Sequence, residues 1–362
     1  GALTRRSDTG SIGATSAEPH KAGRRTSERR SRASYSTWPG TGSGLSSPMA
    51  LGPQEASGSR AGEAGRGGDV GRRLARARAE HGGRPLRDGN MGNFKLIEGR
   101  ESAEAIAQAF VAARQAGNAL TDYPGALPGT LEEAYGIQER AIALFGDRIA
   151  GWKVGKIPAP LDATYGTNRL TGPIFADSVV TAANGEVPEM PVFEQGFAAG
   201  EAEYLLRLGA LPEDFDRPWT NAEVAEYVDA IHVGIEVASS PFAGINAHGP
   251  AVTVSDFGNN NGLVIGAEIP RGTDFLEWPV ALTIEDEVAG EATASTMLDG
   301  PFGAVRFLFE LAADRQLPLA PGQWISTGAV TGVHPVRVGE LVEARFADDY
   351  SVRCRIVGIH DA

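Results

Sequence analysis

Residues 200–208 read GEAEYLLRL, a largely apolar stretch that begins with two glutamates one residue apart. Side chains of a β-strand alternate between its two faces, so we expect Glu201 and Glu203 to project to one side and Ala202 and Tyr204 to the other. Two carboxylates about 7 Å apart along a strand repel each other unless something positive lies between them. The stretch therefore predicts a strand with one apolar face, whose other face is either solvated or binds a divalent cation through oxygen ligands.

Further short apolar runs lie on both sides of this strand, and Gly, Pro, Asp and Asn separate them. The runs read IAGWKVG (149–155), GPIFADSVV (172–180), GLVIGAEI (262–269), PVALTIEDEV (279–288), QWISTGAV (323–330), GELVEARFA (339–347) and SVRCRIVGI (351–359). Runs of this length between turn residues are typical of strands, and here they predict a mostly antiparallel sheet system.

Two helical patterns precede the strands. Residues 101–115 are rich in alanine, and their apolar residues recur at helical spacing. Residues 130–146 begin with a capping box made by Thr130 and Glu133, continue with an apolar stripe and end at Gly146. The N-terminal part of the fold is therefore expected to be a pair of helices.

Two more helices are expected among the strands, at residues 221–232 with Asn221 as the N-cap and at residues 303–316. The order of elements predicts the α+β class. We expect one domain that consists of a helical part in residues 91–150 and a β-rich core in residues 151–362. The core is a large mixed, mostly antiparallel β-roll or sandwich with outer helices.

Charge divides the 362-residue chain into two parts. Residues 1–90 hold 16 of the 33 Lys and Arg residues and 8 of the 46 Asp and Glu residues, whereas the remainder has a net charge of −21. The first part is rich in Gly, Ser and Arg and has too few aliphatic residues to offset the entropy of ordering, so we expect a disordered basic tail. It is either a polyanion-binding tail, an organelle transit peptide or a segment that is not native, in which case Met91 is the true start.

The acidic remainder, residues 91–362, is long enough for one catalytic domain with a substantial core. Its charge argues against nucleic acid and anionic membranes as partners. Cys354 is the single cysteine, so no disulfide can form within one chain, and no apolar run approaches the roughly 20 residues that span a bilayer. We therefore expect a cytoplasmic protein.

A third carboxylate lies in a run that is otherwise almost wholly apolar. Glu236 is part of AIHVGIEVASSPF (230–242), where a carboxylate is costly to bury unless it is paired or binds a metal. The alternative is that it reaches solvent or caps a neighbouring segment. Together, Glu201, Glu203 and Glu236 support the hypothesis of an all-carboxylate Mg²⁺ or Mn²⁺ site. No pair of histidines shows the helical spacing of zinc ligands.

Other polar residues in apolar surroundings suit chemistry on an anionic substrate. Lys153 lies in GWKVG on an expected strand, where a lysine either extends to solvent or meets an anion. Asp177 ends the apolar run GPIFAD and is either a proton-transfer group or a turn residue. Ser326, Thr327 and Gly328 follow a strand and either hold a substrate carboxylate or form an ordinary turn.

Five motifs, in this order and spacing, resemble the 2-keto-4-pentenoate hydratase group of the fumarylacetoacetate hydrolase superfamily, which includes 4-oxalocrotonate decarboxylases. The motifs are GWKVG, GPIFADS, GEAEYLLRL, GIEVASS and WISTGAV, and AYGIQERAI in the second expected helix is also similar. The resemblance covers roughly residue 103 to the C-terminus, and the basic tail has no counterpart in it. It implies the fumarylacetoacetate hydrolase-like fold and a homo-oligomer.

The resemblance also implies roles for individual residues. Glu201, Glu203 and Glu236 match the metal ligands of the group, so it implies Mg²⁺ or Mn²⁺ as the cofactor. Lys153 matches a lysine near the substrate carboxylate or enol, and Asp177 matches the aspartate of the F-A-D motif, so both are expected to be catalytic.

Substrate contacts are implied in the same way. Thr327 and Gly328 match the T-G loop of the group, and Asp256 matches the aspartate of a D-N-A-S motif. The chain departs from the group directly after Asp256, where residues 255–266 read SDFGNNNGLVIG. Because this segment is expected near the pocket, the departure leaves the exact substrate open.

The implied partner is a small 2-oxo or 2-hydroxydienoic acid, and the implied activity belongs to the catabolism of aromatic compounds. The main hypothesis is a metal-dependent hydratase that adds water to a 2-hydroxy-2,4-dienoate and gives a 4-hydroxy-2-oxo acid. One alternative is the decarboxylase of a 2-oxo-3-enedioate, which uses the same kind of site. Another is a non-catalytic scaffold subunit with the same fold.

Overall fold

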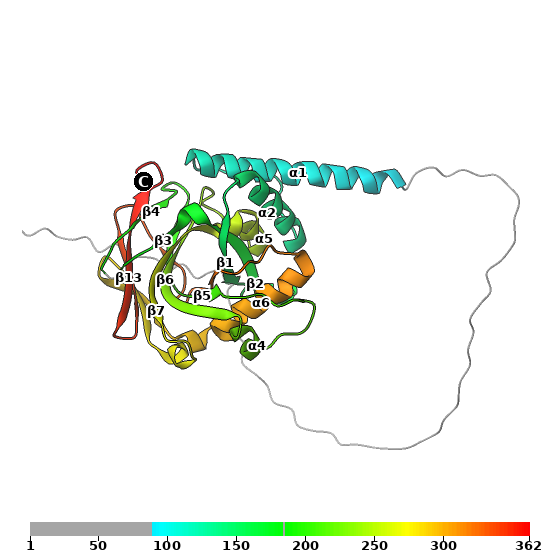
Figure 1. Ribbon diagram of the computed structural model, residues 1–362. Coiled ribbons are helices and arrows are strands. Elements are labelled where there is room, and N and C mark those ends of the chain that lie inside the picture. Colours follow the sequence, from blue (N-terminus) through cyan, green and yellow to red (C-terminus); the bar gives the residue numbers. More distant parts are fainter. Residues whose placement is uncertain (1–88, 184) are drawn as a thin grey trace, which may run out of the picture. The chain divides into compact units, whose positions relative to one another are not determined.

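The computed structural model describes residues 89–183 and 185–362, and Figure 1 shows how their helices and strands are arranged. The basic tail predicted for residues 1–90 therefore lies outside the described residues, apart from Gly89 and Asn90. Within the described part, two β-sheets and the helices around them confirm the predicted α+β class.

The larger sheet has eight strands in the order β2-β1-β10-β5-β6-β7-β3, with the short β11 paired to β5. These strands are β1 (Ile149–Lys156), β2 (Arg169–Phe175), β3 (Val179–Thr181), β5 (Phe197–Leu208), β6 (Val228–Ser240), β7 (Asn260–Ile269), β10 (Trp324–Ser326) and β11 (His334–Pro335). Figure 1 shows that the sheet is curled. As a result, β2 at one edge contacts β7 near the other edge.

The smaller sheet has five strands in the order β4-β13-β12-β8-β9. They are β4 (Glu189–Val192), β8 (Val280–Ile284), β9 (Glu287–Ala292), β12 (Leu341–Phe346) and β13 (Tyr350–Gly358). Three strand pairs in the described part are parallel, namely β1–β10, β3–β7 and β4–β13, and the other pairs are antiparallel. The mostly antiparallel character predicted from the sequence is thus confirmed.

The apolar face predicted for residues 200–208 packs between the two sheets. Tyr204 and Leu206 of β5 join Leu282, Ala344 and Phe346 of the smaller sheet in one buried cluster. Burial of large apolar side chains of this kind is the dominant favourable term in folding, and it fixes which face of β5 points to the core.

The opposite face of β5 points into the curl of the larger sheet. Leu205 meets Ile174 of β2 and Leu263 of β7 there, in a second buried cluster. Glu201 and Glu203 lie on the same face as Leu205 because strand side chains alternate. The curl of the sheet therefore encloses both glutamates.

The helices lie mostly in the N-terminal part and in the connections between strands. They are α1 (Gly89–Ala116), α2 (Leu131–Phe145), α3 (Leu161–Tyr165), α4 (Asn221–Ala225), α5 (Pro250–Ser255) and α6 (Gly300–Arg315), with the 3₁₀ turns η1 (Ala176–Ser178), η2 (Phe257–Asn259), η3 (Asp274–Glu277) and η4 (Ala294–Thr296). The predicted helical pair corresponds to α1 and α2, and the helix predicted at residues 303–316 corresponds to α6. No helix among the described residues combines the length and the apolar character needed to cross a membrane.

The end of α2 follows the predicted signal, and its start shows one of the two hydrogen bonds of the predicted capping box. The Thr130 hydroxyl accepts a hydrogen bond from the Glu133 N–H at 3.2 Å, as an N-cap does. The Glu133 carboxylate accepts from the N–H of Gly129 at 2.7 Å, one residue before the position that a capping box requires. Gly146 ends the helix with a φ angle of 82°, a conformation that glycine adopts without strain.

The helix predicted for residues 221–232 is wrong beyond its first turn. Thr220 is the N-cap in place of Asn221, α4 ends at Ala225, and β6 begins at Val228. From residue 231 to residue 237, β-branched residues stand at every second position, which favours a strand. A capped helix does begin here, one residue earlier than predicted, but the period of two that follows it decides the structure. The sequence analysis also missed α3, α5, β4 and β11.

Candidate metal centre

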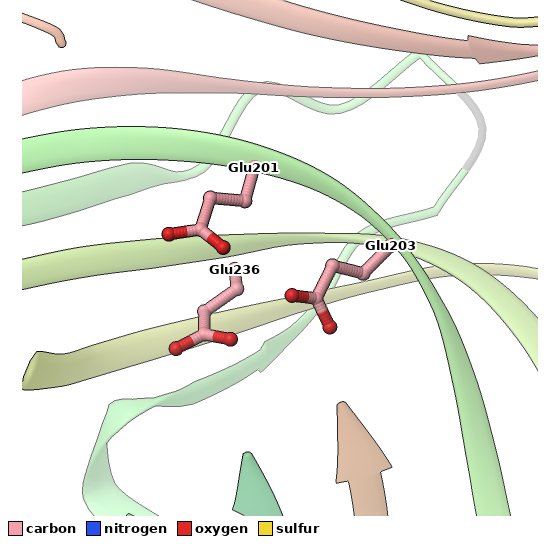
Figure 2. A group of neighbouring side chains, drawn as sticks. All are labelled: Glu201, Glu203 and Glu236. Carbon is pink, nitrogen blue, oxygen red and sulfur yellow. The ribbon is translucent and has the colours of Figure 1, made fainter. Parts of the chain in front are cut away.

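Three buried glutamates lie together inside the curl of the larger sheet, and Figure 2 shows their carboxylates pointing toward one another. Glu201 of β5 is paired directly with Glu236 of β6, and Glu203 lies two residues further along β5. One carboxylate oxygen from each lies within 4.8 Å of the others. The exposed fractions of the three residues are 4%, 1% and 0% in this order. The register of β5 and β6 therefore makes one acidic cluster of Glu236 and the E-x-E pair.

Neighbouring groups orient two of the three carboxylates. Glu203 Oε2 accepts hydrogen bonds from the Ser326 hydroxyl and from the N–H of Gly328, the latter at 3.0 Å. Glu236 Oε1 accepts one from Asn260 Nδ2 at 3.0 Å. Glu203 Oε1 and Glu236 Oε2 are buried and have no hydrogen-bond partner among the described residues. A buried carboxylate oxygen without a partner is strongly disfavoured, so both atoms are suited to a positively charged ligand.

Lys153 of β1 lies beside the cluster and is 5% exposed. Its Nζ is 3.4 Å from Glu236 Oε1 and donates a hydrogen bond to Asn259 Oδ1 at 3.1 Å. Burial acts to lower the pKa of Lys153, but the negative charge of the glutamates outweighs it and raises the pKa above its usual value. Of the two alternatives considered for this lysine, it meets an anion and does not extend to solvent.

The electrostatics of the cluster disfavour three bare carboxylates. Burial raises the pKa of Glu201 to about 8, although the charge of Lys153 opposes the change. Burial, and then the charges of Glu236 and Glu201, raise the pKa of Glu203 well above its usual value. A set of oxygen donors with excess negative charge fits a hard divalent cation such as Mg²⁺ or Mn²⁺.

A cavity of about 340 Å³ adjoins the cluster, a size suited to a small organic molecule. At the cluster it is lined by Lys153, Glu201 and Asn259. The residues 296–298 and the loop 327–333 line other parts of its wall. The wall also includes two more cations and several apolar side chains, namely Lys156, Arg169, Leu170, Met297, Leu298 and Val330. The cavity thus combines an acidic end with basic and apolar walls.

The predicted substrate contacts Thr327 and Gly328 line this cavity. Their polar groups have partners within the protein. The Thr327 hydroxyl donates to the carbonyl oxygen of Tyr204 at 2.8 Å, and the Gly328 N–H donates to Glu203. The loop therefore shapes the wall and orients Glu203, while direct contact with a substrate stays a prediction.

The structure does not bring Asp177 or Asp256 to the cavity. Asp177 is exposed in η1, and its N–H donates to Asp147 Oδ2 at 2.9 Å. Asp256 is fully buried and forms an ion pair with Arg114 of α1 at 2.6 Å. Neither is among the described residues that line the cavity. The roles predicted for them in proton transfer and substrate binding therefore have no support from the geometry.

Sequence reasoning missed two asparagines that contact the site. Asn259 accepts from Lys153 and lines the cavity, and Asn260 donates to Glu236. The available signal was the run of three asparagines at 259–261, which leads into an apolar strand. Amides at the start of a buried strand need hydrogen-bond partners, and the cluster supplies them. Ser326, considered as a substrate-binding hydroxyl, instead donates to Glu203.

No family model matches the chain. Two curated relatives are each 25% identical over 261 residues, a match that covers 70% of this chain and 94% of the relative. They are the 2-keto-4-pentenoate hydratase of Paraburkholderia xenovorans (strain LB400) and 2-keto-4-pentenoate hydratase 3 of Pseudomonas putida.

Solved structures show the same relation at the level of the fold. The 4-oxalocrotonate decarboxylase from Pseudomonas putida G7, complexed with magnesium and adipate, matches with a TM-score of 0.60 and 21% identity over 71% of this chain and 98% of that chain. The same enzyme complexed with calcium and acetate matches over the same shares with a TM-score of 0.59. The sequence relatives and this shared fold confirm that the chain resembles the 2-keto-4-pentenoate hydratase and 4-oxalocrotonate decarboxylase group of the fumarylacetoacetate hydrolase superfamily.

Proposed function

We propose that the chain is a hydro-lyase that uses Mg²⁺ or Mn²⁺ to add water to a 2-hydroxy-2,4-dienoate, giving a 4-hydroxy-2-oxo acid. One observation carries this proposal. Glu201, Glu203 and Glu236 meet in a single buried cluster in which two carboxylate oxygens have no partner among the described residues. The similarity to 2-keto-4-pentenoate hydratases supports the reaction class.

The three glutamates are the residues that would hold the ion. When bound, the ion supplies a Lewis acid that stabilises negative charge on the substrate oxygen as the dienol becomes a ketone. Ser326 and Gly328 hold Glu203 in place, and Asn260 does the same for Glu236. Ligands that are already oriented lose less freedom on binding.

Lys153 is the group proposed to bind the anionic end of the substrate. It lines the cavity, and the field of the glutamates keeps its Nζ protonated. An ammonium group at this position offsets the charge of the substrate carboxylate. Asn259 Oδ1 accepts a hydrogen bond from the Lys153 ammonium group, which fixes the direction in which its remaining N–H groups point.

Glu201 is the member of the cluster that lines the cavity, so we assign the proton transfers to it. In the first step the 2-hydroxyl of the dienol loses its proton and C5 gains one, which leaves a 2-oxo-3-enoate. In the second step water adds across the conjugated double bond, with the hydroxyl on C4 and a proton on C3. Glu201 can hold this water and accept its proton, whereas Asp177 is not among the described residues that line the cavity.

A second candidate reaction is the decarboxylation of a 2-oxo-3-enedioate, and one observation favours it. Lys156 of β1 and Arg169 of β2 are direct partners across the strand pair, and both line the cavity. Arg169 is buried and shares its ion-pair partner Asp299 with Arg306. Two basic groups at the wall suit a substrate with a second carboxylate, which a simple 2-hydroxydienoate lacks.

A panel assay tests the proposal and separates the two reactions. Purified protein with Mg²⁺ is given several 2-hydroxy-2,4-dienoates, and the loss of dienol absorbance is followed. Release of CO₂ is measured with a 2-oxo-3-enedioate. Glu203→Gln should be inactive, and Glu343→Gln in the smaller sheet is the matched control with unchanged turnover. A protein that turns over none of these substrates is not the proposed enzyme, and a scaffold subunit of the same fold then becomes the better explanation.

A further inference from the structure

Residues 256–261, which we call the asparagine turn, hold two side chains of the candidate metal centre. Asn259 Oδ1 accepts a hydrogen bond from Lys153 Nζ at 3.1 Å, and Asn260 Nδ2 donates one to Glu236 Oε1 at 3.0 Å. A hydrogen bond to a ligating carboxylate fixes its orientation and changes its affinity for the ion. The position of the asparagine turn therefore determines where two charged groups of the site point.

The backbone of the asparagine turn is left-handed over three residues, a conformation that the first of them, Phe257, does not favour. Phe257, Gly258 and Asn259 have φ angles of 55°, 61° and 60°. All three lie in the left-handed region, which glycine and asparagine adopt readily but a bulky residue such as Phe257 avoids. Such a backbone persists only where the surrounding structure holds it. Part of this support comes from Gly172 of β2, where a Cβ would lie 2.0 Å from the carbonyl oxygen of Phe257.

Arg114 of α1 forms hydrogen bonds with both ends of the asparagine turn. Its Nε and Nη2 donate to the two carboxylate oxygens of Asp256 at 2.6 and 2.9 Å, which is a bidentate contact. Its Nη1 donates to Asn261 Oδ1 at 3.0 Å. The guanidinium carbon also lies 5.1 Å from the centre of the Phe257 ring. One side chain on an outer helix therefore contacts the first, second and last residues of the turn.

The ion pair is buried and its hydrogen bonds are well satisfied. Arg114 is 8% exposed and Asp256 is 0% exposed. Arg114 Nη2 also donates to the carbonyl oxygen of Ser239 at 3.1 Å, and the Ser240 hydroxyl donates to Asp256 Oδ2 at 2.6 Å. Buried ion pairs often add little to stability compared with apolar residues of the same shape. A role in fixing geometry explains this arrangement better than a role in stability alone.

We propose that Arg114 and Asp256 are positioning residues, whose ion pair holds the asparagine turn in its left-handed conformation and so aims Asn260 at Glu236 and Asn259 at Lys153. Neither member of the pair is among the described residues that line the cavity. The inference rests on the proposed function, because it concerns the affinity of Glu236 and its neighbours for the proposed metal ion. It adds that a residue of α1 controls the affinity of the site for its metal.

Binding of Mn²⁺ alone, measured by isothermal titration calorimetry, tests this inference without any turnover. Arg114→Lys keeps a positive charge opposite Asp256 but cannot form the bidentate contact and reach Asn261 together. We expect the Kd for Mn²⁺ to rise about tenfold or more, which is the size of effect that partners of metal ligands have. A folded Arg114→Lys protein with the wild-type Kd would overturn the inference.

Arg315→Lys is the matched control, because it is the same substitution at another ion pair. Arg315 joins α6 to Glu132 and Glu139 of α2, which lie outside the asparagine turn. Loss of that contact should lower the melting temperature and leave the Kd for Mn²⁺ within about twofold of wild type, since Arg315 supports no partner of the metal ligands. A weaker Kd in this control as well would mean that general loss of stability, and not positioning, sets the affinity.

A double-mutant cycle tests the route through Asn260. Asn260→Ala removes the hydrogen bond to Glu236, and we expect it to weaken Mn²⁺ binding by about tenfold. If Arg114 acts through this bond, Arg114→Lys changes the Kd by less than about twofold when Asn260 is already alanine. Two effects that multiply in the double variant would show independent actions and contradict a positioning role exerted through Asn260.

Ser240→Ala is the milder variant if Arg114→Lys does not fold. It removes one hydrogen bond to Asp256, and the Kd for Mn²⁺ should rise by a smaller factor in the same direction. Wild-type protein that binds no Mn²⁺ would contradict the proposed function itself. Wild-type protein that binds Mn²⁺, with a Kd that no folded variant of Arg114 or Ser240 alters, would contradict only the positioning role.

Discussion

Glu201 of β5 and Glu236 of β6 are direct partners in an antiparallel strand pair, and both are buried. Like charges that face each other across two strands destabilise the pair. Among the described residues, Lys153 is the cation in ion-pair contact with this cluster, so three carboxylates face one ammonium group. One divalent cation would make the cluster neutral.

We expect Mg²⁺ or Mn²⁺ to raise the melting temperature of the wild-type protein and to have no effect on Glu203→Gln. An ion at about 100 times its Kd stabilises the folded state by about 2.7 kcal/mol. For a domain of this size, that corresponds to roughly 5–10 °C. Differential scanning fluorimetry with added metal and with EDTA measures the shift.

The melting temperature of the metal-free protein tests the same variant in a second way. Glu203→Gln should melt at a higher temperature than wild type in EDTA, because it removes a buried carboxylate with excess negative charge around it. Glu343→Gln is the control with the same substitution, and its response to metal should match that of wild type. A metal response that survives in Glu203→Gln would count against the ligand assignment.

Lys153→Met is expected to lower kcat/KM for a 2-hydroxydienoate by about 100-fold to 1,000-fold, the range for loss of one charged group that stabilises a transition state. Methionine keeps the apolar stem but cannot contact Glu236 or Asn259 as the ammonium does. Arg207→Met is the control, since Arg207 is an exposed cation on the strand that carries Glu201. Steady-state kinetics measures kcat/KM for both variants. An equal decrease in the two variants would rule out a special role for Lys153.

Binding of Mn²⁺ should strengthen as the pH rises from 6 to 8. Burial raises the pKa of Glu201 to about 8, so below that pH this carboxyl is mainly protonated in the protein alone, and an ion must displace the proton. One displaced proton changes the apparent Kd by up to about tenfold per pH unit. Calorimetry in buffers with different ionisation enthalpies counts the protons released. A Kd that stays constant across this range would show that the ion displaces no proton from Glu201.

Glu343 is expected to stabilise the fold at neutral pH and to lose this effect in acid. Burial works to raise its pKa, but hydrogen bonds and charge from Arg345 and Arg353 outweigh it and hold the pKa below its usual value. A lowered pKa contributes stability above the unfolded-state value of about 4.3, and the contribution disappears as the pH falls through the lower folded-state pKa.

Thermal melts from pH 7 to pH 3 check this expectation. The difference in melting temperature between wild type and Glu343→Gln should be largest above about pH 5 and shrink toward pH 3. Glu213→Gln serves as the control at an exposed glutamate and should differ little from wild type at any pH. A constant difference for Glu343→Gln would exclude the titration of this carboxylate as the cause.

Gly172→Ala is expected to destabilise the protein and to displace the asparagine turn. The new Cβ would lie 2.0 Å from the carbonyl oxygen of Phe257, so the backbone must move. Gly136→Ala in α2 is the control, because alanine favours a helix by about 1 kcal/mol over glycine. Denaturant unfolding should show opposite signs for the two substitutions. A Gly172→Ala protein as stable as wild type would mean that the turn is not held tightly against β2.

Local signals in the sequence predicted the parts of the fold that depend on neighbours along the chain. The cap at Thr130, the end of α2 at Gly146 and the alternation of residues 200–208 are settled within a few residues. The same kind of reasoning was wrong for residues 221–232. A strong cap at Thr220 starts a helix, but burial of every second side chain between the sheets outweighs it five residues later.

The two aspartates predicted as site residues show more clearly what the sequence could not predict. Asp177 and Asp256 both stood beside apolar runs and matched motifs, yet one lies in an exposed turn and the other pairs with an arginine 142 residues away. A carboxylate next to a strand has many structural uses, and the strand itself does not indicate which one applies. The apolar surroundings of Glu236 were more informative, because few arrangements make a buried carboxylate tolerable.

The sequence by itself determined that Glu201 and Glu203 share one face of a strand whose other face is apolar, and that Glu236 lies in an apolar run where a buried carboxylate needs a partner of opposite charge. Only the tertiary structure decided that the register of β5 and β6 brings these carboxylates within 4.8 Å of one another, with Lys153 beside them. It also decided that Arg114 supports the site through Asp256. Alternation follows from the geometry of a single strand, whereas register and curl follow from packing between segments that lie far apart in the chain.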